Sequence, residues 1–221
     1  MKKAPKSVQG KFSSLVLIRH GESEWNAKGL WCGWIDVPLS EKGKREAKLA
    51  ASNLKDLRFD IAFTSDLKRA SHTLEIIKAE LGLLSLPTII EPAFKERHYG
   101  IYAGKNKWKI KEKIGGEKFK KLRRGWDIPI PNGESLKDVY TRVIPKFEEH
   151  IMPQIWKGSN ILFVAHGNSN RALIKYLENI SDEVISEIEI ATGEVLIYKL
   201  DKRGKIIAKE KRLVNQDKGK Q

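Results

Sequence analysis

Two short apolar runs in the sequence each end at a His-Gly pair. Residues 15–18 run into Arg19 and His20-Gly21, and residues 161–165 run into His166-Gly167. Unbroken apolar runs of this length are typical of strands buried on both faces of a parallel sheet. Ligands of open α/β sheets bind beyond the carboxyl ends of such strands. We therefore predict two imidazoles side by side at one sheet edge, and the matching positions favour a catalytic pair over two structural histidines.

Arginines accompany these histidines in the sequence. Arg19 directly precedes His20, Arg69 lies near the start of a helix expected after another strand, and Arg97 lies in an irregular segment. Cationic neighbours repel a divalent metal ion, whereas the guanidinium fork matches the oxygens of a phosphate. A neutral histidine beside them can act as a nucleophile. These residue types predict phosphoryl transfer through a phosphohistidine.

The predicted chemistry also needs a proton donor. A carboxylic acid must protonate the leaving oxygen and take a proton from the incoming one. Glu96, in the irregular segment, and Glu22, just after the first His-Gly pair, are both candidates for this role.

Composition excludes several other classes of protein. The 221 residues hold one cysteine, Cys32, so an intramolecular disulfide is impossible, which favours a reducing compartment. No apolar run is long enough for a secretion signal or a membrane helix, and we expect the cytoplasm. Phosphate-loop, zinc-protease and Cys-x-x-Cys motifs are absent. The formal net charge of +14 fits an anionic small molecule at least as well as nucleic acid, for which no recognition motif is present.

Strand and helix patterns alternate along the chain. Serines predict the helix starts at Ser40 and Ser135. The alternation predicts an α/β fold, a doubly wound, mostly parallel sheet with helices on both faces and an antiparallel edge strand. We expect one domain over 1–221, with a flexible basic lead-in over 1–12 and a mobile polar tail over 215–221. Further strands are expected at residues 59–63, 86–90, 195–200 and 205–214.

The glycine- and tryptophan-rich segment 25–38 has two compatible interpretations. It is a surface loop pinned by tryptophans in the core, or a lip over the site in which Gly33 allows close backbone approach to a ligand.

The motifs resemble those of a known family. Residues 19–23 together with residues 166–169 resemble the histidine phosphatase superfamily. Longer matches are similar to the cofactor-dependent phosphoglycerate mutases, and they lie at residues 21–26, 33–40, 64–70, 96–100, 104–107 and 123–125. The resemblance runs from about residue 15 to about residue 198.

The resemblance implies a role for each matching residue. His20 would be the phosphorylated nucleophile and Glu96 the general acid and base. The transferring phosphoryl group would be held by Arg19, Arg69, His166 and the Gly167 amide, with hydrogen bonds from Ser23 and Asn26. The substrate's carboxylate and remote phosphate would be held by Arg97, Tyr99, Lys107, Arg123 and Arg124, with Gly33 and Asn168 lining the pocket. Cys32 also lies in this substrate-binding set, at a position where the family usually has threonine.

The implied activity is the interconversion of 3-phosphoglycerate and 2-phosphoglycerate in glycolysis and gluconeogenesis, primed by 2,3-bisphosphoglycerate without a metal. The implied partners are small-molecule phosphoglycerates, with no nucleic acid and no membrane, and the oligomeric state stays open between homodimer and monomer. One alternative is a phosphatase that passes the same phosphoryl group to water. Another is a non-catalytic anion- or partner-binding module, which the presence of His20, Glu96 and His166 disfavours.

Overall fold

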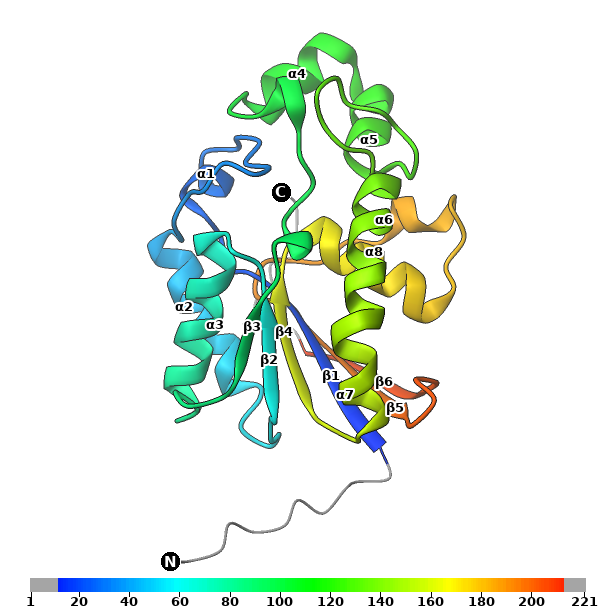
Figure 1. The fold of residues 1–221 in the computed structure, drawn as a ribbon. Helices are drawn as coiled ribbons and strands as arrows, with labels where there is room; N and C mark the ends of the chain where they lie inside the picture. The colour runs from blue at the N-terminus through cyan, green and yellow to red at the C-terminus, as the bar shows by residue number, and fades with distance from the viewer. Residues whose placement is uncertain (1–11, 213–221) are drawn as a thin grey trace, which may run out of the picture.

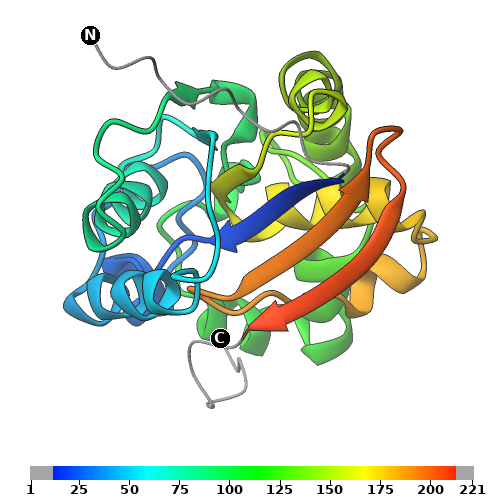
Figure 2. The same cartoon turned by 90° about the horizontal axis from the view of Figure 1, so that it is seen from below.

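A six-stranded sheet forms the centre of the computed structural model, which describes residues 12–212 (Figure 1). In spatial order β3-β2-β4-β1-β5-β6, the first four strands are parallel. Strand β5 runs antiparallel to β1, and β6 runs antiparallel to β5 at the sheet edge (Figure 2). The predicted mixed sheet is confirmed, and its antiparallel part is a two-stranded hairpin. The strands are β1 (Phe12–Arg19), β2 (Ile61–Thr64), β3 (Thr88–Ile90), β4 (Ile161–Ala165), β5 (Val195–Asp201) and β6 (Ile206–Arg212).

The two strands that carry the His-Gly pairs are direct neighbours. Strands β1 and β4 pair in parallel, with Leu15 opposite Ile161 and Arg19 opposite Ala165. The next amide, that of His20, donates to the Ala165 carbonyl at 2.9 Å. The segments that follow β1 and β4 therefore leave the sheet at the same edge and at the same level, as the sequence predicts.

Helices cover both faces of the sheet because side chains of a strand alternate between the faces. Val16 and Ile18 of β1 pack in a cluster with Ala50 of α2, whereas Leu15 and Leu17 pack on the opposite face, toward α6 and α8. Figure 1 shows α2 and α3 on one side of the sheet, and α6, α7 and α8 on the other. These helices are α2 (Glu41–Ser52), α3 (Lys68–Glu80), α6 (Leu136–Lys146), α7 (Met152–Trp156) and α8 (Gly167–Glu178).

The serine caps form as predicted. The Ser40 side chain accepts from the Gly43 amide at the start of α2, and Ser135 forms a capping box with Asp138 at the start of α6. Pro145 lies inside α6, and a π-helical turn η3 (Phe147–Ile151) follows before α7. Pro145 has no backbone N–H to donate to the preceding turn, and the regular α-helix ends one residue later.

A small helical layer lies beyond the carboxyl edge of the sheet (Figure 1). Trp31 is buried against Phe119, Leu122 and Ile130, so a tryptophan of the 25–38 segment does pin this layer to the loop. The layer and the remaining short turns comprise α1 (Glu24–Ala27), α4 (Lys107–Ile114), α5 (Gly116–Arg124), η1 (Pro92–Phe94), η2 (Gly100–Tyr102) and η4 (Val184–Glu187).

The two predicted terminal segments lie almost wholly outside the described residues. Only Phe12 of the basic lead-in is described, and it begins β1 rather than belonging to a loose segment. The polar tail 215–221 is outside the described residues, as is the end of the strand expected over 205–214. Within 12–212, no helix has the length and hydropathy needed to cross a membrane.

The turn after β1 is pressed against the start of α2. A Cβ added to Gly43 would lie 2.0 Å from the Glu22 carbonyl oxygen. We expect Gly43→Ala to lower the free energy of unfolding by about 2–4 kcal/mol, because backbone has to move to relieve the overlap. Urea denaturation measures the change. Gly116→Ala is the control, since its nearest neighbour would be 4.0 Å away, and equal midpoints for both variants would contradict the prediction.

Candidate active site

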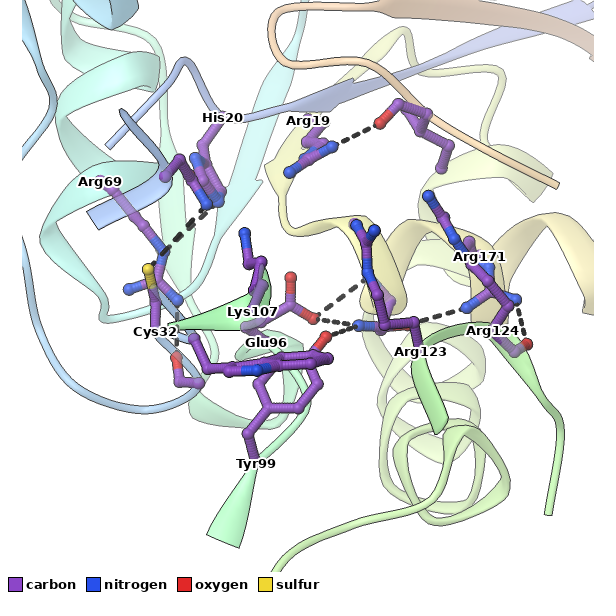
Figure 3. A pocket seen from close by; sticks show the side chains of 16 residues that line it. Arg19, His20, Cys32, Arg69, Glu96, Tyr99, Lys107, Arg123, Arg124 and Arg171 are labelled. Carbon is purple, nitrogen blue, oxygen red and sulfur yellow. Dashed lines mark hydrogen bonds between the residues drawn. The ribbon is translucent and has the colours of Figure 1, made fainter. Parts of the chain in front are cut away.

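A cavity opens at the carboxyl edge of the sheet, where both His-Gly turns end (Figure 3). Its wall combines β1 and α8 with the 25–38 segment and the helical layer. The lining residues are Arg19, His20, Asn26, Trp31, Cys32, Gly33, Arg69, Glu96, Tyr99, Lys107, Arg123, Arg124, Gly167, Asn168, Arg171 and Ile190.

His20 is held as a neutral imidazole. Its Nδ1 lies 2.6 Å from the Gly21 carbonyl oxygen, which can only accept, so Nδ1 carries the proton and Nε2 keeps its lone pair. Burial, and then the charges of Arg69 and Arg19, lower the pKa of His20 well below 6.5. The side chain therefore has the protonation state that a nucleophile needs at neutral pH.

The second histidine lies beside the first. The ring centroids of His20 and His166 are 5.0 Å apart, at an interplanar angle of 64°. His166 Nε2 lies 2.7 Å from Ser65 Oγ, and its buried Nδ1 has no partner among residues 12–212. Burial and the charge of Arg69 also lower the pKa of His166. The prediction of adjacent imidazoles is confirmed.

Arg69 joins the histidines to the 25–38 segment. Its Nε donates to His20 Nε2 at 3.3 Å, and its two terminal nitrogens donate to the carbonyls of Gly33 at 2.7 Å and Ile35 at 3.0 Å. The backbone of Gly33 thereby closes one side of the cavity. The segment is thus both a pinned loop and a wall of the site, so its two interpretations hold together.

Glu96 presents one carboxylate oxygen to the protein and one to the cavity. Oε1 accepts from the Arg97 amide at 2.7 Å and from the backbone and side-chain nitrogens of Asn168 at 3.2 and 2.9 Å. The other oxygen, Oε2, points away from Asn168 into the cavity (Figure 3). The Glu96 carbonyl accepts from Trp34 Nε1 at 2.7 Å and from Arg142 Nη2 at 2.9 Å, which holds the backbone as well.

The other candidate acid, Glu22, lies apart from the cavity wall. Its carboxylate accepts from Ser40 Oγ at 2.8 Å and pairs with Lys42 at 3.3 Å. Of the two carboxylates that the sequence left open, only Glu96 is placed to exchange a proton with a group bound in the cavity.

The cavity wall is strongly cationic. Glu96 is the one carboxylate in a lining that holds five arginines and a lysine. Burial, and then the charges of Arg123 and Arg19, lower the pKa of Lys107 to about 8. Burial lowers the pKa of Arg171 to about 9, so both remain cations at neutral pH. Such a wall suits a ligand with several negative charges rather than a metal ion, and among residues 12–212 no three His, Cys, Asp or Glu side chains form a group able to hold one.

Three residues predicted to hold the substrate or the transferring phosphoryl group are not among the residues that line the cavity, namely Arg97, Ser23 and His166. Arg97 is buried and donates to the carbonyls of Leu122 and Ile128, each at 2.9 Å, and to that of Glu134. Ser23 caps α1, and its hydroxyl bonds Asn26. Because the polar atoms of Arg97 and Ser23 are engaged within the protein, the structure does not place either of them in direct contact with a bound substrate.

Three lining residues were missed by sequence reasoning, namely Trp31, Ile190 and Arg171. A signal existed for Arg171, which follows Asn168 by three residues and so shares its face of the helix. Trp31 was predicted only as a core anchor, and nothing local to the sequence marks Ile190.

Comparisons with known proteins agree with this geometry. The family model described as histidine phosphatase superfamily (branch 1) matches residues 15–211. A Schizosaccharomyces pombe protein named phosphoglycerate mutase is 50% identical over 198 residues, covering 89% of this chain and 94% of that protein. A Parvibaculum lavamentivorans protein named 2,3-bisphosphoglycerate-dependent phosphoglycerate mutase is 46% identical, with the same coverage of 89% and 94%. A mycobacterial glucosyl-3-phosphoglycerate phosphatase, solved in complex with VO3, has a TM-score of 0.75 at 25% identity, covering 84% of this chain and 92% of its own.

Proposed function

The chain belongs to the histidine phosphatase superfamily, and we propose that it works as a 2,3-bisphosphoglycerate-dependent phosphoglycerate mutase. The enzyme interconverts 3-phosphoglycerate and 2-phosphoglycerate, a step of glycolysis and gluconeogenesis. The observation that carries the assignment is the extent of the cationic wall. Lys107, Arg123 and Arg124 continue it beyond the His20 turn, so it offers charges for a second phosphate and a carboxylate.

The chemical roles follow from the geometry around the two histidines. His20 Nε2 attacks the phosphorus of a bisphosphoglycerate, the bond from phosphorus to the sugar-acid oxygen breaks, and Glu96 gives its proton to that oxygen. In the reverse sense the phosphohistidine passes its phosphoryl group to the free hydroxyl of an incoming phosphoglycerate, and Glu96 takes the proton of that hydroxyl. The bisphosphoglycerate so formed then returns the phosphoryl group of its other position to His20, which completes the isomerisation. Arg19 and Arg69 balance the charge of the transferring group, and the neutral His166 and the Gly167 amide offer hydrogen bonds to it.

The remaining roles concern the rest of the substrate. Tyr99, Asn168 and Asn26 supply neutral polar groups of the cavity wall, and Cys32 and Gly33 contribute the wall of the 25–38 segment. We propose 2,3-bisphosphoglycerate as the phosphoryl primer, no metal requirement and a cytoplasmic location. We also propose that residues 1–221 act as one domain.

The alternative within the superfamily is transfer to water. It is favoured by the likeness of the fold to a phosphatase, whereas the additional cations favour retention of a bisphosphate until it has turned over. One assay separates the two, namely incubation of 3-phosphoglycerate with and without 2,3-bisphosphoglycerate, in chelator, with 2-phosphoglycerate and free phosphate both measured. Primer-stimulated isomerisation with little phosphate released is expected. Phosphate release without isomerisation would make the enzyme a phosphatase, and loss of activity in chelator would overturn the metal-free route.

The low pKa of Lys107 makes substrate capture depend on pH. Its charge is present below about 8 and is lost as the pH rises through that value. We expect kcat/KM for 3-phosphoglycerate to fall about tenfold between pH 7 and 9.5, because a charged hydrogen bond to the substrate is lost. Lys107→Arg stays charged over this range, so the part of the decrease centred near pH 8 should disappear in the variant, while any decrease near pH 9 belongs to Arg171 and should remain. The exposed Lys105→Arg is the control that should retain the whole decrease, and an unchanged profile in Lys107→Arg would refute the role.

A further inference from the structure

Arg171 is a buried cation of the cavity wall with no role in the reaction as described so far. It lies on α8, is 2% exposed, and donates from Nη2 to the carbonyls of Arg124 at 2.7 Å and Ile185 at 2.6 Å. Its Nη1 donates to Asn168 Oδ1 at 2.9 Å. The guanidinium thus joins the carbonyls of two other helical segments, α5 and η4, to the side-chain amide of Asn168.

The contact with Arg171 determines which way the Asn168 amide faces. Arginine has only donors, so the Asn168 atom beside it must be the carbonyl oxygen. The amide nitrogen then has to face the other way, where it donates to Glu96 Oε1 and to Tyr99 Oη, each at 2.9 Å. A flipped amide would set its nitrogen against the guanidinium and its oxygen against the Glu96 carboxylate.

The amide orientation in turn decides which oxygen of Glu96 carries the proton. Oε1 accepts from three N–H donors, two on Asn168 and one on Arg97, and an oxygen surrounded by donors does not keep a proton of its own. The proton of the acid form therefore resides on Oε2, which Figure 3 shows directed into the cavity.

We propose that Arg171 is a positioning residue for the acid–base step, which it serves by orienting the Asn168 amide and through it the proton-carrying oxygen of Glu96. The inference rests on the proposed mutase function for its kinetic consequence. It does not require Arg171 to touch the substrate, although Arg171 lies in the cavity wall.

The test is a double-mutant cycle between Arg171 and Asn168, measured on isomerisation. Arg171→Met should lower kcat about tenfold with KM changed less than about twofold, because proton transfer is misaligned while binding cations remain. In an Asn168→Ala background the same change should lower kcat less than about twofold further, since there is no amide left to orient.

Lys175→Met provides a matched control on the same helix. Lys175 lies one turn beyond Arg171 and donates to the Ile180 carbonyl at 2.6 Å, so it also ties α8 to a following segment. Within residues 12–212 it forms no hydrogen bond with Asn168. Its effect on kcat should be small and equal in both backgrounds. An Arg171→Met loss of equal size in both backgrounds, or a loss confined to KM, would overturn the proposal in favour of a structural or substrate-binding role.

A second readout does not depend on which reaction the enzyme catalyses. The side-chain amide of Asn168, followed by ¹⁵N NMR, should exchange slowly with water in the parent protein and at least about tenfold faster in Arg171→Met. If Arg171→Met does not fold, Arg171→Gln takes its place in both experiments, because a glutamine amide offers an acceptor as well as donors and so does not fix the Asn168 amide. Unchanged exchange in the variant would refute the positioning role, whereas a parent enzyme that releases phosphate without isomerising would refute only the mutase assignment.

Discussion

Replacing His20 with alanine is expected to reduce isomerisation at least about 10⁴-fold, because the proposed nucleophile that carries the phosphoryl group is removed. The Nε2 atom of His20 keeps its lone pair and accepts only a long contact of 3.3 Å from Arg69 Nε, whereas Nε2 of His166 lies 2.7 Å from Ser65 Oγ. Steady-state assays with 2,3-bisphosphoglycerate measure the loss. Incubation with labelled primer should at the same time show no phosphate bound to the variant.

The matched control is His72→Ala, which removes an exposed imidazole of α3 outside the site. It should keep full activity and full labelling by the primer. Thermal unfolding of both variants checks that folding is intact. Near-normal turnover in His20→Ala, or persistent labelling of that variant, would mean that another group carries the phosphoryl.

Glu96→Gln is expected to lower kcat by about 10²–10⁴-fold, the range typical for loss of a general acid. Glutamine keeps the shape of the side chain and can still accept from the two nitrogens of Asn168, but it cannot deliver a proton to the leaving oxygen. KM should change little, because the cations of the wall are untouched. Rapid-quench measurement of His20 phosphorylation isolates the affected step.

Glu22→Gln tests which of the two candidate carboxylates, Glu96 or Glu22, is the proton donor. Glu22 is engaged with Ser40 and Lys42 away from the cavity, so its substitution should leave kcat within a few fold of the parent value. If Glu22→Gln were the slower variant, the acid–base role would pass to Glu22 through a rearrangement that this structure does not show.

The fold was largely predictable because its signals are local. The buried runs of β1 and β4, the serine caps of α2 and α6 and the alternation of strands with helices each follow from short-range patterns. The pairing of the last two strands also follows from their short connection. Less predictable was the small helical layer, whose anchoring on Trp31 depends on contacts between distant segments.

The placement of side chains in the cavity wall was predictable for residues at the ends of strands that carry a motif. It was not predictable for a side chain that points into the protein interior and away from the cavity. Arg97 follows Glu96 directly, yet three backbone carbonyls take its donors and remove it from the cavity. Arg171 is the reverse case, because only its spacing of three residues from Asn168 marks this helical arginine as a site residue. In the structure, carbonyls of α5 and η4 accept from its guanidinium and hold it in the cavity wall. Neither outcome can be deduced from residue type, because both depend on which carbonyls the tertiary fold leaves without partners.

The sequence by itself determined the chemistry of this protein, through two histidines at strand ends, arginines for an anion and a carboxylate within an irregular loop. The two histidines come together because each directly follows one of two neighbouring parallel strands, and the pairing of Arg19 with Ala165 places the strand ends level with each other. Residue types left Glu96 and Glu22 open and the family resemblance implied Glu96, whereas only the tertiary structure shows that Glu96 lines the cavity while Glu22 does not, and which oxygen of Glu96 faces the cavity. The physical reason is that hydrogen-bond partners from distant segments, Asn168 for one carboxylate and Ser40 for the other, orient each side chain.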